Sequence, residues 1–542
     1  MSDLEVRIMN GRSTAKVPAS ESMVRVTSIG AVLSEWAGKK GGEPFYTWYQ
    51  REKAVQSWSW SGFDSHVNRL AGFLSAAGVK TGGRIATAGA NHPAVILTYF
   101  AAWKLGACVI PLNMGEDNQR LKTILTQGDP GVIMVLDEEM DRVGPMAGGR
   151  KVVSSREVMS VSGPEWKADP AVSLLNHEAL IVYTSGTTGA PKGVVLSQYQ
   201  LLVDSFEIAR WHRLSENDHL LCVLPVHHVN GTVVTHVTPL VAGARISMMQ
   251  KFSPDGMVSV IRSAGITVTS VVPTLLQYLC EAAPPDSFAG TALRHVICGA
   301  GPLTVDLAMK TENRFGIPLI HGYGLSETTC YSCFIPIDTD RETRHHWLSA
   351  HGFPSIGVPL PCNDMDIQTD SGEPVADGIR GEIVIRGHNV MNGYDQNTEA
   401  TDKAFTHGWF RSGDEGFRLT DGGGRTWFFI TGRFKELIIR GGVNLSPLEI
   451  DEVINQCPGV KAGLAIGFDN DWYGEEVGAM VIRSAPDLTE EAVIAFCRAH
   501  LPASKCPKVV VFTDELPVTS TGKYQRGKVK DRFSAWKTTQ FR

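Results

Sequence analysis

Short apolar segments that each end in a turn recur from residue 84 to residue 324, and they constrain the fold most. Candidate strands of this kind are residues 84–88, 107–112, 132–136, 179–182, 220–224, 266–272, 294–298 and 318–320. Helical patterns separate several of them, and one places apolar side chains on one face: Val67, Leu70, Ala71 and Leu74. Strands that alternate with helices predict a parallel, doubly wound α/β sheet. Because ligands bind beyond the carboxyl ends of such strands, we expect the turns to converge on one cleft.

The segments before residue 60 and after about residue 352 show other patterns. Residues 1–60 are expected to be irregular. From about residue 352, strands between Gly-rich turns predict an antiparallel β subdomain, with strand candidates at residues 382–386 and 427–430. A second α/β pattern begins near residue 435. Within it, Ser446 and Glu449 have capping-box spacing, and Pro447 between them favours a first helical turn.

Residues 183–193 read Tyr-Thr-Ser-Gly-Thr-Thr-Gly-Ala-Pro-Lys-Gly and follow an apolar strand candidate. Small residues allow backbone N–H groups to approach an anion, hydroxyls add donors, and Lys192 adds a positive charge. The composition therefore predicts a phosphate-binding loop, with an ordinary loop as the alternative. A Walker A loop is excluded because Gly193 stands where Ser or Thr must hold Mg²⁺. Ser197 and Gln200 then have the spacing of a capping box.

Composition narrows the class of protein. A chain of 542 residues is too long for one core, and its net charge of −6 argues against nucleic-acid binding. No apolar run reaches the roughly 18 residues that span a membrane. Because the polar N-terminus resembles no secretory signal and most cysteines lie in apolar surroundings, we expect a cytoplasmic protein. The pair Cys330 and Cys333 is weak evidence for a metal or redox site, and a structural role in a pocket wall is the favoured interpretation.

Six motifs in order carry a resemblance to a known family. They are residues 183–193; 224–231, Leu-Pro-Val-His-His-Val-Asn-Gly; 322–327, Gly-Tyr-Gly-Leu-Ser-Glu; 411–414, Arg-Ser-Gly-Asp; 432–435, Gly-Arg-Phe-Lys, followed by 441–444, Gly-Gly-Val-Asn; and 521–526, Thr-Gly-Lys-Tyr-Gln-Arg. Together they resemble the adenylate-forming superfamily, which includes acyl-CoA synthetases, aryl-CoA ligases and adenylation domains. The resemblance covers roughly residues 60 to 530.

The resemblance and the patterns together imply the fold. A large N-terminal domain, residues 1–434, is expected to hold two doubly wound α/β subdomains and a β-barrel-like subdomain. A small, mobile α+β domain, residues 435–542, is expected to act as a lid.

The resemblance also implies a site for ATP and Mg²⁺. Glu327, a hard oxygen ligand, would hold Mg²⁺. Asp414 would accept the ribose hydroxyls, Arg433 would contact ribose or phosphate, and Tyr323 would stack on adenine. Residues expected at the phosphates or elsewhere around the nucleotide are Thr184, Ser185, Gly186, Thr187, Thr188, Lys192, Gly299, Ala300, Gly301, Pro302, Gly322, Gly324 and Ser326. The ordinary alternatives are a helix N-terminal acid for Glu327, a turn residue for Asp414, a surface residue for Arg433 and a buried aromatic for Tyr323.

Three further roles follow from the resemblance. Lys523 would bridge the carboxylate and the α-phosphate during adenylation, and Lys435 would be the hinge of the lid. Gly441 and Gly442 would line a tunnel for the CoA pantetheine, because missing side chains leave room beside the backbone.

The acid pocket is the least defined part. His228 is expected to gate the pocket or contact the acyl group, with a satisfied core histidine as the alternative. The neighbouring His227 stands where the family often has Phe, which would make the pocket more polar. Other expected wall residues are Asn230, Val272, Thr274, Cys330 and Cys333.

The sequence therefore predicts an ATP-dependent carboxylate–CoA ligase that forms an acyl-adenylate and then an acyl-CoA. A stand-alone adenylation enzyme that loads a carrier-protein pantetheine is the alternative. A non-catalytic binding protein is a remote one, because Lys523, Glu327 and Asp414 are all present. We expect a compact aryl, alicyclic or medium-length acid, and a monomer or homodimer.

Overall fold

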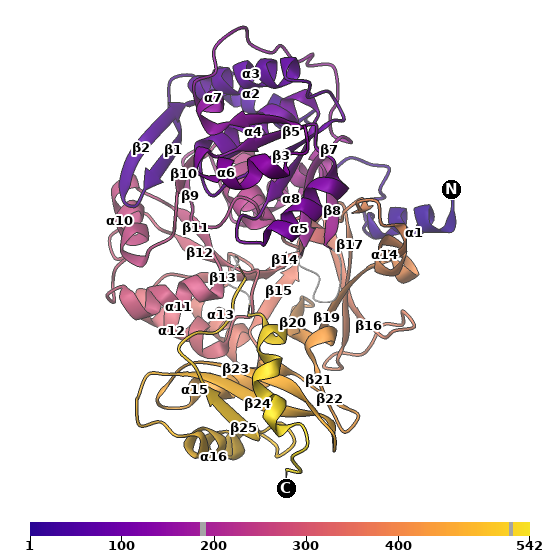
Figure 1. Ribbon diagram of the computed structural model, residues 1–542, viewed down its shortest axis with the longest axis vertical. Coiled ribbons are helices and arrows are strands. Elements are labelled where there is room, and N and C mark those ends of the chain that lie inside the picture. The colour runs from indigo at the N-terminus through magenta and orange to yellow at the C-terminus, as the bar shows by residue number, and fades with distance from the viewer. Residues whose placement is uncertain (185–190, 520–523, 542) are drawn as a thin grey trace.

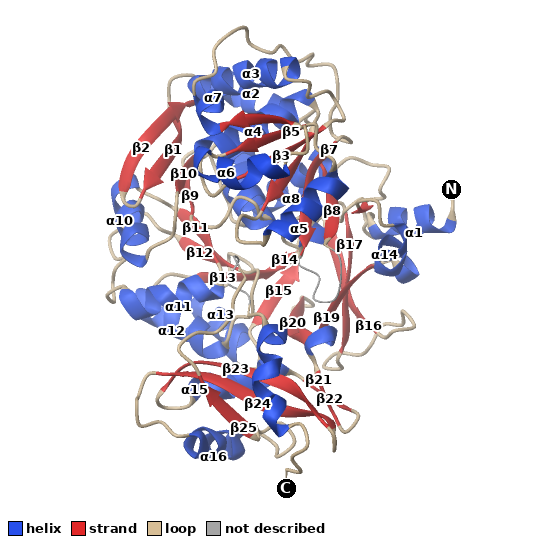
Figure 2. Ribbon diagram, viewed as in Figure 1, coloured by secondary structure: helices blue, strands red, loops and turns tan. Residues whose placement is uncertain are grey.

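The computed structural model describes residues 1–184, 191–519 and 524–541. In this part of the chain the strands form three sheets (Figures 1 and 2). The order of the first sheet is β18 (Gly393–Tyr394), β8 (Lys192–Ser197), β7 (Glu178–Thr184), β4 (Cys108–Leu112), β3 (Arg84–Ala88), β5 (Val132–Val135) and β6 (Lys151–Ser154).

The second sheet is longer and begins with antiparallel strands. Its order is β16 (Asn363–Gln368), β17 (Gly381–Gly387), β19 (Phe410–Thr420), β20 (Thr426–Arg433), β15 (Ser355–Pro359), β14 (Cys333–Phe334), β13 (Leu319–Tyr323), β12 (His295–Cys298), β11 (Val268–Val271), β9 (His219–Cys222), β10 (Arg245–Met249), β1 (Pro44–Gln50) and β2 (Lys53–Ser59). The third sheet contains β22 (Val443–Leu445), β21 (Ile438–Arg440), β24 (Gly474–Arg483), β23 (Val460–Asn470) and β25 (Val509–Phe512).

The helices connect and cover these sheets. In chain order the α-helices are α1 (Asp3–Gly11), α2 (Ile29–Lys40), α3 (Trp60–Ala76), α4 (Pro93–Leu105), α5 (Asn118–Gly128), α6 (Met140–Val143), α7 (Ser155–Met159), α8 (Gln198–Trp211), α9 (Thr238–Ala242), α10 (Pro254–Ala264), α11 (Pro273–Ala282), α12 (Val305–Phe315), α13 (Arg341–Ser349), α14 (Thr398–Ala404), α15 (Pro447–Gln456) and α16 (Glu490–His500). A π-helix, η3 (Asn230–Val237), precedes α9.

The first sheet is doubly wound, as its sequence predicts. Strands β3, β4 and β5 are parallel, and alternate residues face opposite sides. Ile85 packs into the core that includes α4, while Ala86 packs into the core that includes Leu121 and Ile124 of α5. Burial on both faces explains the nearly continuous apolar character of these strands.

The second sheet is parallel from β13 to β1 and antiparallel beyond β13. The predicted antiparallel strands are confirmed, and hydrogen bonds through β14 and β15 join them to the parallel part. The expectation of an irregular segment at residues 1–60 was wrong, because α1, α2, β1 and β2 lie there. Strand β1 pairs with β10, a partner about 200 residues later, so its order depends on a distant contact.

The small domain has its own apolar cores. Two clusters draw all their buried members from residues 438–533, and Phe541 packs against one of them. Figure 1 shows this domain in gold and yellow beneath α11 and α12. Among the described residues, the helices are each too short or too polar to cross a membrane.

Only one of the two predicted capping boxes forms in the structure. The box at Ser197 is confirmed, because its side chain and that of Gln200 cap the start of α8 reciprocally. The box at Ser446 was wrong. Helix α15 does begin with Pro447, but the Ser446 hydroxyl donates to the carbonyl of Thr431 and makes no cap.

Candidate active site

Strands β7 and β8 bring together the two described ends of the predicted phosphate-binding loop. Thr184 pairs with Lys192 across the ladder. The Thr184 hydroxyl lies 3.4 Å from the Lys192 carbonyl. The predicted contacts Ser185, Gly186, Thr187 and Thr188 lie outside the described residues.

Charged residues from other elements support the base of this loop. The Arg120 guanidinium on α5 donates to the Thr184 carbonyl at 3.1 Å. Asp395 receives two hydrogen bonds from Arg84, at 2.9 and 3.1 Å, and one from the Tyr183 hydroxyl at 3.3 Å. Sequence reasoning missed Arg84, Arg120 and Asp395, because an isolated charged residue carries no local sign of such a contact.

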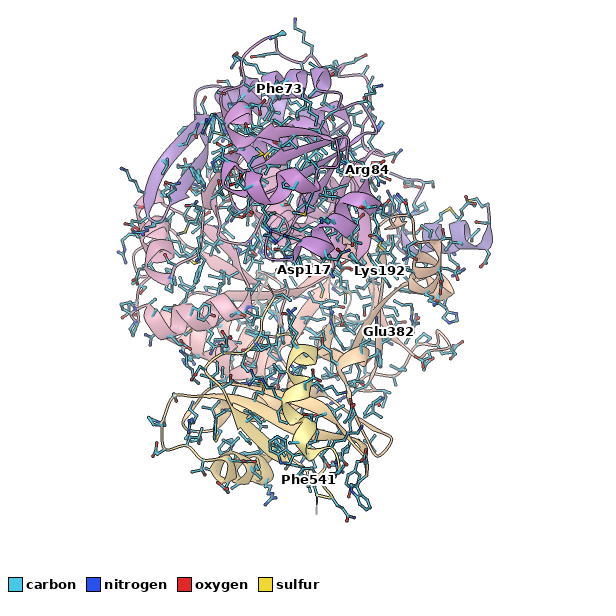
Figure 3. The ribbon with its side chains drawn as sticks, viewed as in Figure 1. Phe73, Arg84, Asp117, Lys192, Glu382 and Phe541 are labelled. Carbon is cyan, nitrogen blue, oxygen red and sulfur yellow. The ribbon has the colours of Figure 1, made fainter. Side chains whose placement is uncertain are left out.

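A short chain of contacts joins Lys192 to Glu327. The Lys192 ammonium lies 5.0 Å from the centre of the Tyr394 ring. The Tyr394 hydroxyl donates to Glu327 Oε1 at 2.9 Å. Burial and the Glu327 charge raise the pKa of Tyr394, so its hydroxyl stays a donor. Figure 3 shows Lys192 near the middle of the molecule, below Arg84 and above Glu382. Tyr394, on β18, is another residue that sequence reasoning missed.

A second cluster joins three predicted residues: Tyr323, Asp414 and Arg433. The Tyr323 hydroxyl donates to Asp414 Oδ2 at 2.6 Å, and Arg433 Nε lies 2.9 Å from Asp414 Oδ1. Asp414 is almost fully buried, and its Oδ1 is held by the charge of Arg433, whose Nε–H is not aligned for a hydrogen bond. Burial and the Asp414 charge raise the pKa of Tyr323. Antiparallel pairing of β19 with β20 sets Asp414 opposite Arg433.

Glycines allow the loops after β12 and β13 to pack closely. A Cβ on Gly299 would lie 2.5 Å from the Tyr331 hydroxyl, and one on Gly322 would overlap the Phe334 ring. A Cβ on Gly324 would lie 2.1 Å from the Cys330 carbonyl oxygen. Ala300, Gly301 and Pro302 continue the first loop, and Ser326 begins a 3-10 turn after the second.

Part of the predicted acid pocket is a buried polar cluster. The Asn230 side chain donates to the Tyr331 hydroxyl at 3.1 Å and accepts from Ser270 at 2.8 Å. All three are nearly inaccessible to solvent. Val272 directly follows the neighbouring β11, immediately before α11, and is also buried; Thr274 lies in the first turn of α11. Sequence reasoning named Asn230 but missed Ser270 and Tyr331.

The two adjacent histidines follow β9. The rings of His227 and His228 are half-buried, with their centres 4.5 Å apart. Burial lowers the pKa of His227, which favours the neutral imidazole at neutral pH. The tight turn beneath them depends on Gly231, where a Cβ would lie 2.3 Å from the Pro225 carbonyl oxygen.

The predicted cysteine pair lies in the protein interior. Cys330 and Cys333 are buried free thiols, and burial raises the pKa of both. Among the described residues, His, Cys, Asp and Glu form no cluster of three that could hold a metal ion. The thiols lie beside the Tyr323 segment, where Cys333 contacts the Tyr323 carbonyl at 3.8 Å.

Four predicted residues belong to the expected lid: Lys435, Gly441, Gly442 and Lys523. Lys435 is exposed in a 3-10 turn between β20 and β21. Gly441 and Gly442 form the exposed turn between β21 and β22, and the Gly441 amide donates to the Tyr473 carbonyl at 2.8 Å. Lys523 lies outside the described residues.

Two family models match the chain. The model described as AMP-binding enzyme matches residues 33–395, and the model described as AMP-binding enzyme C-terminal domain matches residues 449–523.

Several CoA ligases are similar over most of the chain. Feruloyl-CoA synthase of an Amycolatopsis species is 33% identical over 468 residues, which cover 86% of this chain and 92% of that one. Oxalate–CoA ligase of Arabidopsis thaliana is 32% identical, and the match covers 85% of this chain and 90% of that one. Indoleacetate–CoA ligase of Aromatoleum aromaticum is 32% identical, and the match covers 92% of this chain and 97% of that one.

A solved structure agrees with the whole architecture. ATP-bound MatB from Rhodopseudomonas palustris has a TM-score of 0.82 at 26% identity, covering 94% of this chain and 100% of that chain. The apo form of MatB, at the same identity and coverage, has a TM-score of 0.70. The arrangement of this chain is therefore closer to the ATP-bound form of that protein.

Proposed function

Because the chain belongs to the AMP-binding enzyme family, we propose that it joins a compact aryl, alicyclic or medium-length carboxylic acid to CoA. The chain is an ATP-dependent, AMP-forming carboxylate–CoA ligase, as its relatives are CoA ligases over most of its length. The acid attacks the α-phosphorus of ATP, which gives an acyl-adenylate and pyrophosphate. The CoA thiol then displaces AMP and gives the acyl-CoA.

The observation that carries the site assignment is the Tyr323–Asp414–Arg433 cluster. Asp414 is a buried carboxylate whose Oδ1 is paired with the Arg433 guanidinium at 2.9 Å and whose Oδ2 accepts a hydrogen bond from Tyr323 at 2.6 Å. Each carboxylate oxygen has more than one lone pair, so Asp414 can still accept hydrogen bonds from a ligand. A ribose hydroxyl would donate to it, while Tyr323 and Arg433 hold the carboxylate in place. We assign adenine stacking to Tyr323 and a ribose or phosphate contact to Arg433.

Glu327 and Lys192 fit the phosphate end of ATP. Mg²⁺ is usually held by one or two carboxylates together with substrate phosphates, and Glu327 offers one half-exposed carboxylate. The bound ion would supply positive charge to the departing pyrophosphate. Lys192 adds an ammonium on the neighbouring strand, next to the loop that contains Ser185, Thr187 and Thr188.

Lys523 is assigned the charge that adenylation needs between the carboxylate and the α-phosphate. We assign Lys435 to the hinge about which the lid turns. We assign Gly441 and Gly442 to the wall of the tunnel that admits the CoA pantetheine. The exposure of the Gly441–Gly442 turn supports this division, since the turn must approach the site in a second arrangement of the lid.

The polar surroundings of the acid pocket support a compact acid. Asn230, Ser270 and Tyr331 form a polar cluster, and His227 stands next to His228. A long alkyl chain would gain little from such neighbours, because burial of apolar surface drives its binding.

A panel of acids scored for pyrophosphate release, with and without CoA, tests the reaction and its acceptor. We expect at least one compact acid to release pyrophosphate and to give CoA-dependent turnover. Adenylation without CoA-dependent turnover for any good acid would instead favour a carrier-protein acceptor. The Lys523→Ala variant should lose pyrophosphate release yet still convert supplied acyl-adenylate and CoA to acyl-CoA. The control is Lys528→Ala, which removes an exposed lysine nearby in the sequence and should retain both steps.

A further inference from the structure

The N-terminus of α12 is capped by a side chain from the other domain. Glu452 on α15 accepts hydrogen bonds from the backbone N–H groups of Val305, at 3.0 Å, and Asp306, at 3.2 Å. The helix's own cap, Thr304, accepts only from Leu307, at 3.2 Å. Free N–H groups at a helix start carry partial positive charge, so a carboxylate is well suited to them.

This contact lies directly behind a predicted nucleotide-binding loop. Helix α12 begins three residues after Pro302, which ends the loop that follows β12. Figure 1 shows α15 beneath α12. The lid thus contacts the first turn of the helix that follows this loop. Movement of Glu452 would therefore change the contacts of residues next to the predicted nucleotide site.

Weaker contacts continue the interface on α11. Gln277 donates to the Lys461 carbonyl at 3.2 Å, and the Lys461 ammonium lies 3.4 Å from Glu281. Exposed ion pairs of this kind contribute little to stability, because solvent screens them. The partly buried contact of Glu452 with two backbone donors is the more specific one.

The observed arrangement brings the described residues after position 523 close to the large domain. Tyr524, the residue after Lys523, lies within electrostatic reach of Tyr278 and Glu281 on α11. The Gly441–Gly442 turn is meanwhile exposed and contacts Tyr473 of its own domain. The higher similarity to ATP-bound than to apo MatB agrees with an arrangement suited to ATP.

We propose that Glu452 is a positioning residue that holds the lid in the arrangement used for adenylation and releases α12 before the CoA step. This inference rests on the proposed function, because it assigns Glu452 to one of the two half-reactions. A rigid lid cannot present the exposed Gly441–Gly442 turn to the site while Glu452 keeps its place on α12.

The test compares the two half-reactions in Glu452→Ala and Glu452→Gln, with the best acid of the panel. Loss of a hydrogen bond to a charged group corresponds to a decrease of about 10- to 100-fold in the rate of the step that depends on it. We therefore expect pyrophosphate release to fall by that factor in Glu452→Ala and less in Glu452→Gln, which keeps one acceptor. Conversion of supplied acyl-adenylate and CoA should be unchanged or faster. An equal decrease in both half-reactions, or in neither, would overturn the assignment.

Two controls separate docking from simple loss of structure. Glu491→Ala removes an exposed glutamate of the same domain and should leave both half-reactions unchanged. Thr304→Ala removes the helix's own cap; if it reproduced the split between half-reactions, fraying of α12 would explain the result and the proposal would fail.

A measurement without substrate tests the contact itself. In ligand-free protein, hydrogen exchange of the Val305 and Asp306 amides should accelerate at least about 10-fold in Glu452→Ala, because their acceptor is lost. Equal exchange in wild type and variant would refute the contact even if no acid were found. Failure of every acid in the wild type would instead refute the proposed function.

Discussion

At the scale of single residues, Glu327 and Tyr394 show how a site residue acquires its setting from a distant part of the chain. Glu327 belongs to a motif that can be read from the sequence. The hydroxyl that orients it comes from Tyr394, 67 residues later, whose ring also faces Lys192. The sequence thus predicts the carboxylate, while only the fold identifies what holds it.

We expect Glu327→Gln to lower the rate of adenylation, and to change its response to Mg²⁺ concentration, far more than Tyr394→Phe does. Loss of a charge placed at the reacting phosphates corresponds to a rate decrease of about 100-fold or more. Loss of one neutral hydrogen bond corresponds to about 10-fold or less. Titration of pyrophosphate release with Mg²⁺ measures both, with Tyr46→Phe as a control for a buried tyrosine elsewhere. An unchanged Mg²⁺ requirement in Glu327→Gln would contradict the metal assignment.

At the scale of elements, two similar patterns had different outcomes. The pairs Ser197–Gln200 and Ser446–Glu449 have the same spacing, yet only the first forms a capping box. At the second, the Ser446 hydroxyl bonds a carbonyl of β20, and Glu449 pairs with Lys505 at 2.6 Å. Local spacing offers a hydrogen bond, and tertiary partners compete for it.

Gly324 gives a sharp prediction at this scale. In Gly324→Ala the new methyl would meet backbone atoms, 2.1 Å from the Cys330 oxygen and 2.7 Å from the Tyr331 Cα, which cannot move independently. The segment that carries Tyr323 and Glu327 must therefore shift, and we expect the kcat/KM for ATP in pyrophosphate exchange to fall at least about 10-fold, equivalent to 1.4 kcal/mol.

A matched glycine provides the control. Gly38→Ala, in the exposed face of α2 with open space around it, should leave exchange unchanged and raise the melting temperature slightly. Unaltered exchange in Gly324→Ala would show that the loop after β13 tolerates the shift.

At the scale of the whole molecule, the apolar cores divide between residues before and after the predicted boundary at 434/435. Buried members of three clusters come from residues 24–429, and those of the other two from residues 438–533. The contacts between the two parts are mainly polar, as at Glu452 and Lys461. Such an interface is consistent with relative motion of the domains.

We expect a fragment of residues 1–434 to fold without the lid, bind ATP and fail to release pyrophosphate. A fragment of residues 1–351 should not fold, because it lacks β15 to β20 of the second sheet. Circular dichroism, calorimetry and ATP titration distinguish the two. A disordered 1–434 fragment would show that the lid is part of one folding unit.

The sequence by itself determined the α/β class, most strands in the parallel parts of the first two sheets and the motif residues that the site brings together. These depend on neighbours along the chain: apolar runs, turn residues and small side chains at fixed spacing. Only the tertiary structure decided the pairing of β1 with β10, the pairing of Arg84 with Asp395 beside the predicted phosphate-binding loop, and the contact of Glu452 with α12. These depend on which surfaces meet after folding, and no local pattern of residues encodes the partner.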